Sequence, residues 1–179
     1  MKAIPPVNAR LCRCMATVAS LGIVVVLSIK ALVWVVPGWP EQFVRSAADL
    51  PPEPFTVTPL VRMLGIGVTT LGVVPLLWAF WTARSLFRCF ADGRIFEVQS
   101  GQLLRRFGQA FLIYAAVSPF VLPLLVWVLT FENPTGHKLV WFGVSGDELI
   151  LALVGALILV MGSVLADAVR MADENRQIV

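Results

Sequence analysis

Four long apolar segments, separated by polar connections, dominate the hydrophobic pattern of the chain. They cover about residues 15–36, 64–87, 109–131 and 147–169. An α-helix rises about 1.5 Å per residue, so about twenty apolar residues suffice to cross a hydrocarbon core of roughly 30 Å. The pattern therefore predicts an all-α membrane protein, a single domain over residues 1–179 with four transmembrane helices.

The connection between the second and third segments, residues 84–108, alternates apolar and basic positions. Gly93, which follows Phe90-Ala-Asp92, is typical of a helix C-cap. Beyond it, apolar residues recur at helical spacing among polar ones: Leu103, Leu104 and Phe107 against Gln99, Gln102, Arg105 and Arg106. This spacing predicts an amphipathic helix at the membrane interface between spans two and three.

The other two connections carry weaker signals. Residues 37–63 hold six of the twelve prolines, a composition that predicts an external loop rather than a continuous helix. Residues 55–58 alternate and are expected to pair as a strand with residues 138–144. Ser145 and Glu148 have the spacing of a capping box and predict the start of the fourth helix.

The distribution of positive charge predicts the topology. Ten of the fourteen Lys and Arg residues fall before the first span, in residues 84–108, or in the C-terminal tail, whereas Arg45, Arg62 and Lys138 lie in the other two connections. Short basic connections stay on the cytoplasmic side, so both termini are expected there, with an uncleaved first span. Tryptophans near span ends are expected to anchor the lipid interface: Trp34, Trp39, Trp81 and Trp127.

Composition narrows the function. With 58% hydrophobic and 14% charged residues, the chain does not have the composition of a soluble domain. The net charge of +3 suggests attraction to anionic lipids rather than direct nucleic-acid binding. Catalytic motifs are missing from the sequence, so an enzyme is not expected. Cys12 and Cys14 lie across the expected membrane from the single histidine, His137, so neither a metal site nor another cofactor is expected.

Two ionisable residues fall in or beside the spans, and each leaves two alternatives open. Lys30 either extends its ammonium to the outer headgroups or forms a substrate or proton site with Thr69 and Thr70. Asp167 either pairs with Arg84 or Arg88 from the second span or pairs with Arg170 and solvent. Arg170 and Glu174 follow Asp167 at helical spacing and extend it into a charged ladder.

Three stretches together resemble a known family: Phe90-Ala-Asp-Gly-Arg-Ile-Phe96, Leu104-Arg-Arg-Phe-Gly108, and the tail Leu165-Ala-Asp-Ala-Val-Arg-Met-Ala-Asp-Glu-Asn-Arg-Gln-Ile-Val179. The chain resembles the bacterial integral-membrane family catalogued as domain of unknown function 2975. The resemblance implies four spans in a bacterial inner membrane and association with small helix-turn-helix regulators. It implies no activity and no site residues.

The sequence thus predicts a non-enzymatic, regulatory inner-membrane protein that presents residues 84–108 and its tail to a cytoplasmic partner. The candidate interaction and structural residues are Arg84, Arg88, Gly93, Arg94, Phe96, Arg105, Arg106, Asp167, Arg170 and Glu174. The alternative is a small transporter or channel subunit that uses Lys30 and Thr70 together with the third span, which Pro119 and Pro123 bend.

Overall fold

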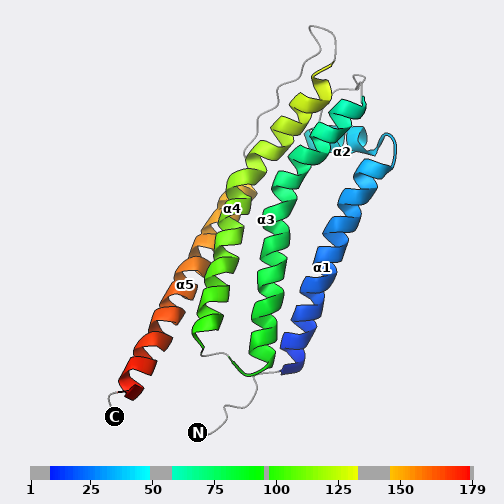
Figure 1. Ribbon diagram of the computed structural model, residues 1–179. Helices are drawn as coiled ribbons and strands as arrows, with labels where there is room; N and C mark the ends of the chain where they lie inside the picture. The colour runs from blue at the N-terminus through cyan, green and yellow to red at the C-terminus, as the bar shows by residue number, and fades with distance from the viewer. Residues whose placement is uncertain (1–8, 49–57, 95–96, 133–145, 178–179) are drawn as a thin grey trace.

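Five helices form the part of the chain that the computed structural model describes, residues 9–48, 58–94, 97–132 and 146–177 (Figure 1). In chain order they are α1 (Ala9–Val35), α2 (Trp39–Ala48), α3 (Pro59–Ala91), α4 (Val98–Thr130) and α5 (Gly146–Gln177). Four of them, α1, α3, α4 and α5, are long and apolar enough to cross a membrane. The prediction of an all-helical protein with four helices able to span a membrane is confirmed.

Helices α3 and α4 are longer than the spans predicted within them. Each has 33 residues, or about 50 Å of helix, against a hydrocarbon core of roughly 30 Å. The predicted interfacial helix between spans two and three is not a separate element, because residues 98–107 form the first turns of α4. The helix continues through Gly108, which packs against α5.

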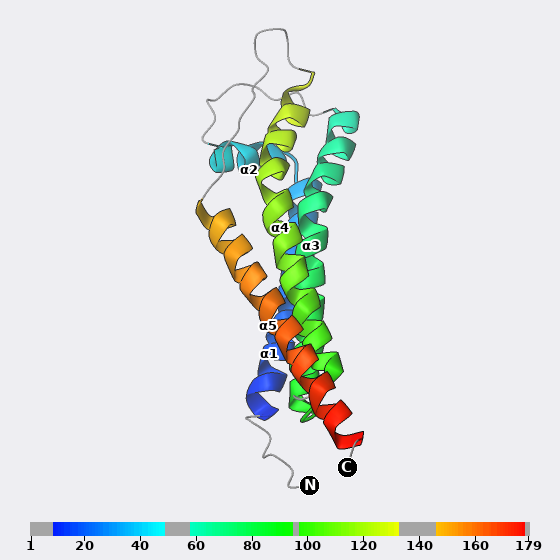
Figure 2. The ribbon, with the colours of Figure 1, turned by 90° about the vertical axis from the view of Figure 1, so that its left-hand side faces the viewer.

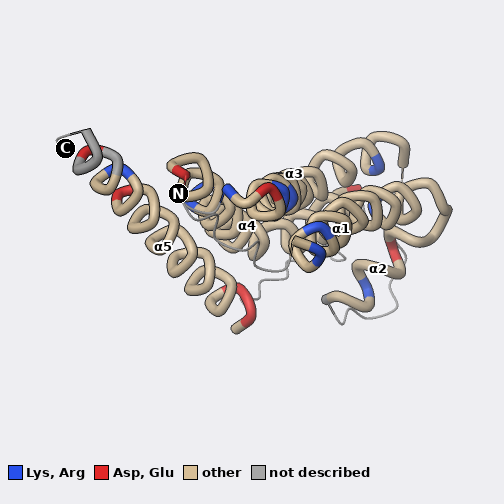
Figure 3. The backbone as a smooth tube through the Cα atoms, turned by 90° about the horizontal axis from the view of Figure 1, so that it is seen from below, with Lys and Arg blue, Asp and Glu red and all other residues tan. Residues whose placement is uncertain are grey.

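The four long helices stand in an open row rather than in a closed bundle. Helix α1 packs on α3, α3 on α4, and α4 on α5, and no other pair of long helices brings described Cα atoms within 8 Å. The order is visible along the helix axes in Figure 3, and α5 crosses α4 obliquely in Figure 2. Of the two alternatives for Asp167, the one that brings the second and fourth spans together is therefore wrong, because α4 lies between α3 and α5.

Small residues bring α4 and α5 into backbone contact. A Cβ atom added to Gly108 would lie 2.5 Å from the amide nitrogen of Leu159, and one added to Gly162 would lie 2.5 Å from that of Arg105. Gly101 meets Ala166 in the same way, with 2.8 Å to its Cβ. Small residues permit this close approach in lipid. We call these contacts the glycine seam.

Helices α1 and α3 are joined instead by polar side chains. Trp34 donates from Nε1 to Thr69 Oγ1 over 3.2 Å, and Lys30 donates from Nζ to Thr70 Oγ1. Arg62 donates to the carbonyls of Trp34 and Val35 at the C-terminal end of α1, where helix carbonyls lack intrahelical partners. The expected role of Trp34 as a lipid anchor is wrong: it is 5% exposed, and its ring lies against Gly65.

Helix α2 corrects the expectation of an external loop over residues 37–63. Pro40 occupies the second position of α2 and Pro59 the first position of α3, where a missing backbone N–H costs no intrahelical bond. Val44 is fully buried in a cluster with Trp34, Val61 and Leu129. Helix α2 therefore packs against α1, α3 and α4 at one end of these helices. The predicted strands lie outside the described residues except for Thr58, which instead caps α3. The capping-box serine, Ser145, also lies outside them.

Candidate functional site

The two ends of the long helices, at the opposite faces of any membrane that they cross, differ in charge. One end holds the start of α1, the α3–α4 turn and the end of α5 (Figures 1 and 3). Among the side chains that the structure describes there, seven arginines are exposed: Arg10, Arg13, Arg88, Arg94, Arg105, Arg106 and Arg170. We call it the basic end and the opposite one the α2 end. Because α1 begins where α5 ends, both lie on the same side of any membrane that the four helices cross.

Gly93 sets the geometry of the turn at the basic end. Its φ is +77°, a left-handed conformation that side chains with a Cβ rarely adopt. The Gly93 N–H donates to the Phe90 carbonyl and the Arg94 N–H donates to the Cys89 carbonyl, both over 3.1 Å. These two bonds form a Schellman motif, so the predicted helix cap at Gly93 is confirmed.

Two buried small side chains, which the sequence reasoning did not identify, hold the turn together. Ser100 donates from Oγ to the Arg94 carbonyl over 2.6 Å, and its oxygen lies 3.3 Å from Cys89 Sγ. Both side chains are buried. The only available signal was position, since Cys89 stands four residues before Gly93 and Ser100 lies in the first turn of the next helix. Phe96, predicted as part of this turn, lies outside the described residues.

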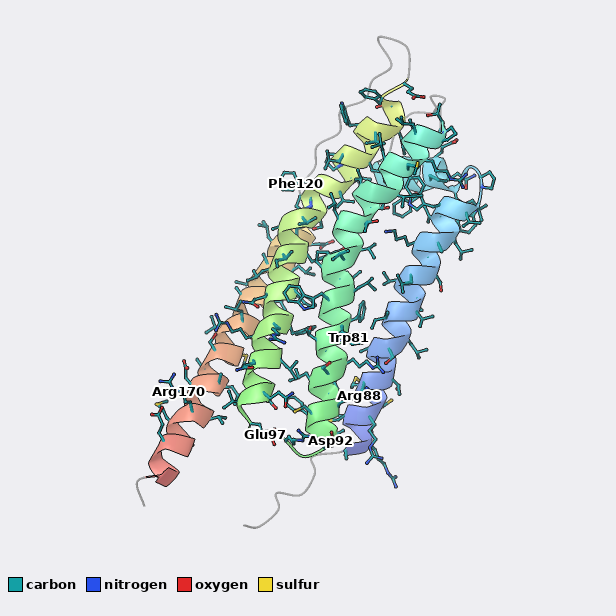
Figure 4. All side chains as sticks on the ribbon, in the orientation of Figure 1. Trp81, Arg88, Asp92, Glu97, Phe120 and Arg170 are labelled. Carbon is teal, nitrogen blue, oxygen red and sulfur yellow. The ribbon has the colours of Figure 1, made fainter. Side chains whose placement is uncertain are left out.

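A groove of about 510 Å³ runs between α3 and α4 at the basic end. Arg88 of α3, Arg94 of the turn and Arg106 of α4 line it together with Asp92, and Trp78 and Trp81 line its other part. Figure 4 shows Trp81, Arg88 and Asp92 in that order along α3 toward the turn. We call it the arginine groove.

Arg84 and Arg105 lie outside the groove. The guanidinium carbon of Arg84 is 5.6 Å from the centroid of the Trp81 ring, and its Nε is buried without a hydrogen-bond partner among the described residues. Arg105 faces the other neighbour, since its backbone meets Gly162 of α5. The five arginines of residues 84–108 therefore do not form one cluster.

The charged ladder on α5 is only half formed. Arg170 Nε lies 3.2 Å from Glu174 Oε1, an exposed pair one helical turn apart. Asp167 is exposed and forms no ion pair with Arg170, Arg84, Arg88 or any other described residue. Both expected pairings of Asp167 with an arginine are therefore absent.

At the α2 end, Lys30 and Thr70 meet as the sequence suggested. Two neighbouring cavities lie beside α2, one of about 260 Å³ among α1, α3 and α4 and one of about 320 Å³ between α3 and α4. Both have Thr69, Phe43 and Leu125 in their walls. Lys30 lines the first of them. Ser118 lines the second, and its hydroxyl is buried without a partner among the residues described.

Comparison with known proteins gives one match. The family model described as "Protein of unknown function (DUF2975)" matches residues 47–179, which include α3, α4 and α5. No curated protein and no solved structure matches the chain. The glycine seam, the α3–α4 turn and the arginine groove all fall within the matched residues, whereas α1 and Lys30 fall outside them.

Proposed function

Because the chain belongs to the DUF2975 family of proteins of unknown function, we propose its function from its geometry. It is a non-enzymatic, regulatory protein of a bacterial inner membrane, and its basic end binds a soluble partner on the cytoplasmic side. A small helix-turn-helix regulator is the partner class that we propose.

The charge of the basic end supports this proposal most directly. Its exposed arginines come from separate elements, and Arg13, Arg105 and Arg106 form no ion pair with another described residue. A surface of one sign attracts a partner of the opposite sign and favours correct encounter. The partner would therefore present an acidic face to the α3–α4 turn and to the end of α5.

The orientation is testable on its own. The excess of Lys and Arg at the basic end supports a cytoplasmic location for that end. Reporter fusions after Arg94 and Val179 should read as internal, and fusions at Asp49 and Lys138 as external. An external reading at Arg94 contradicts the cytoplasmic partner.

The partner itself is tested by crosslinking and pull-down from membranes, followed by a binding measurement with the recovered protein. Arg105→Glu with Arg170→Glu should weaken that binding at least tenfold, because both exposed charges are reversed. Arg45→Glu reverses one charge at the α2 end and, as the control for location, should leave the binding unchanged. Equal loss in both variants, or no loss in either, contradicts recognition by the basic end.

The alternative function, a small transporter or channel subunit, has one observation in its favour. Lys30 and the unpartnered hydroxyl of Ser118 line neighbouring cavities next to α4, which contains Pro119 and Pro123. Buried polar groups without partners mark candidate ligand sites. Loss of function in Lys30→Met, Thr70→Val and Ser118→Ala, with the basic-end variants still active, would favour this alternative over partner binding.

A further inference from the structure

The arginine groove extends along the sides of α3 and α4 rather than across the end of the molecule. On α3 its wall runs from Trp78 to Arg88 and continues to Asp92 at the cap, about 20 Å of helix. On α4 it includes Leu103 and Arg106, one turn apart. A ligand in this groove would therefore lie parallel to the spans, with one end at the turn and the other beside the apolar part of the helices.

The turn end of the groove suits an anion. Arg88 and Arg106 face it from opposite helices, and neither forms an ion pair with another described residue. Arg94 is only loosely engaged, since its Nη1 lies 4.0 Å from Glu97 Oε2 in an exposed pair of little energetic value. Among the described residues of the wall, Asp92 is the one acid, which leaves an excess of positive charge. Guanidinium groups bind phosphate oxygens through paired N–H donors.

The other end of the groove suits a hydrocarbon chain. Trp78 and Trp81 line it, and Trp81 is 59% exposed on the side of α3. Indole rings favour the level of the lipid headgroups, where one part is apolar and another wet. Charge at one end and aromatic surface at the other correspond to the two ends of an amphiphile.

We propose that the arginine groove is a binding site for an anionic phospholipid, whose phosphate is held by Arg88, Arg94 and Arg106 and whose chains pass Trp78 and Trp81. Basic pockets between transmembrane helices bind lipid headgroups of this kind. The soluble partner is proposed to contact the α3–α4 turn and the end of α5, so it shares Arg94 with the lipid site, but Arg88, Arg106 and the two tryptophans belong to the groove and its tests need no soluble partner. Free inorganic phosphate shares the headgroup chemistry but leaves the tryptophans without a role.

The first test is lipid retention, measured by native mass spectrometry of the full chain released from mixed phosphatidylglycerol and phosphatidylcholine. Wild type should keep phosphatidylglycerol in preference, and Arg88→Gln with Arg106→Gln should reduce that preference at least tenfold. Arg105→Gln with Arg170→Gln removes the same charge outside the groove and should keep it. Equal reduction in both double variants, or no preference in wild type, overturns the proposal.

The second test separates lipid from free phosphate and does not require an arginine variant. Phosphatidylglycerol with brominated chains should quench tryptophan fluorescence more than brominated phosphatidylcholine, and the excess should disappear in Trp78→Phe with Trp81→Phe. In neutral detergent without phospholipid, millimolar inorganic phosphate should show no saturable binding. Saturable phosphate binding that needs Arg88 and Arg106, without excess quenching by the anionic lipid, assigns the groove to free phosphate and overturns the lipid.

Discussion

Along the α4–α5 interface, Gly108 and Gly162 set backbone against backbone, whereas along the α1–α3 interface Lys30, Trp34 and Arg62 reach across to hydrogen-bond with the partner helix. Lipid supplies no hydrophobic force between apolar helices, so van der Waals packing and hydrogen bonds must hold them together. Each interface relies mainly on one of these two contributions.

The two interfaces should therefore respond differently to substitution. Backbone atoms at the glycine seam have no room to move aside, so an added side chain must separate the helices over several turns. A lost side-chain hydrogen bond, in contrast, removes one local contribution and leaves the helices where they are. We expect large, cooperative effects at the seam and small, separable ones between α1 and α3.

The largest expected effect is that of Gly108→Val. Its Cβ would meet the Leu159 nitrogen at 2.5 Å and the Gly155 oxygen at 2.8 Å, both backbone atoms. Overpacking of this kind costs about 3 kcal/mol. The free energy of unfolding in mixed micelles measures it. Gly67→Ala in α3 is the control: no atom lies within 4 Å of its added Cβ, so no loss is expected. Equal stability of Gly108→Val and wild type contradicts the seam.

Sequence alone identified what depends on local pattern. The four apolar helices follow from apolar length, because bilayer thickness sets that length, and the cap at Gly93 follows from a glycine directly after Phe90-Ala-Asp92. The contact of Lys30 with Thr70 could be anticipated because residue counts place both at similar depth. In each case the relevant physics lies within one helix or is set by the membrane.

The sequence did not show which helices pack against each other. Gly101 and Gly108 differ from Gly67 only through the helix that faces them, and that choice is not encoded in either segment alone. The arginine groove forms because α4 packs back against α3, which brings Arg88 and Arg106 to the same cavity. Helix α2 is hidden in the sequence for a different reason: a proline-rich stretch is typical of a loop, but Pro40 stands at a helix start, where proline is favoured.

The next largest effect should follow Arg62→Met, which sharpens the account of the α1–α3 interface. Arg62 donates to two carbonyls at the end of α1, and hydrogen bonds to charged groups contribute about 2 kcal/mol. We expect a loss of that size in the free energy of unfolding. Arg62→Lys keeps the charge but not the paired donors and should lose less. If the two variants lose the same, the carbonyl contacts do not account for the role of Arg62.

A smaller effect is expected for the pair of Lys30 and Thr70. Side-chain hydrogen bonds between helices in membranes average about 0.6 kcal/mol in double-mutant cycles. The cycle of Lys30→Met and Thr70→Val should give a coupling energy of that order, measured by unfolding in bicelles. Thr69→Val in place of Thr70→Val is the control, because Thr69 accepts from Trp34. If the coupling energy between Lys30 and Thr69 is as large as that between Lys30 and Thr70, the pair of Lys30 and Thr70 is not specific.

The last prediction concerns α3 and α5, between which we expect no coupling energy. Arg84 and Asp167 belong to helices that α4 separates, and Asp167 is exposed, so the cycle of Arg84→Gln and Asp167→Asn should be additive within about 0.3 kcal/mol. The pair of Arg170 and Glu174, one turn apart on α5, sets the scale of an exposed pair on one helix, for which a coupling of about 0.3 kcal/mol is expected. A larger coupling between Arg84 and Asp167 than within α5 would mean that the row closes and brings α3 against α5. The glycine seam would then no longer be the only attachment of α5 among the described helices. Additivity leaves α5 held through α4 alone, which is why a single side chain at Gly108 is expected to release it.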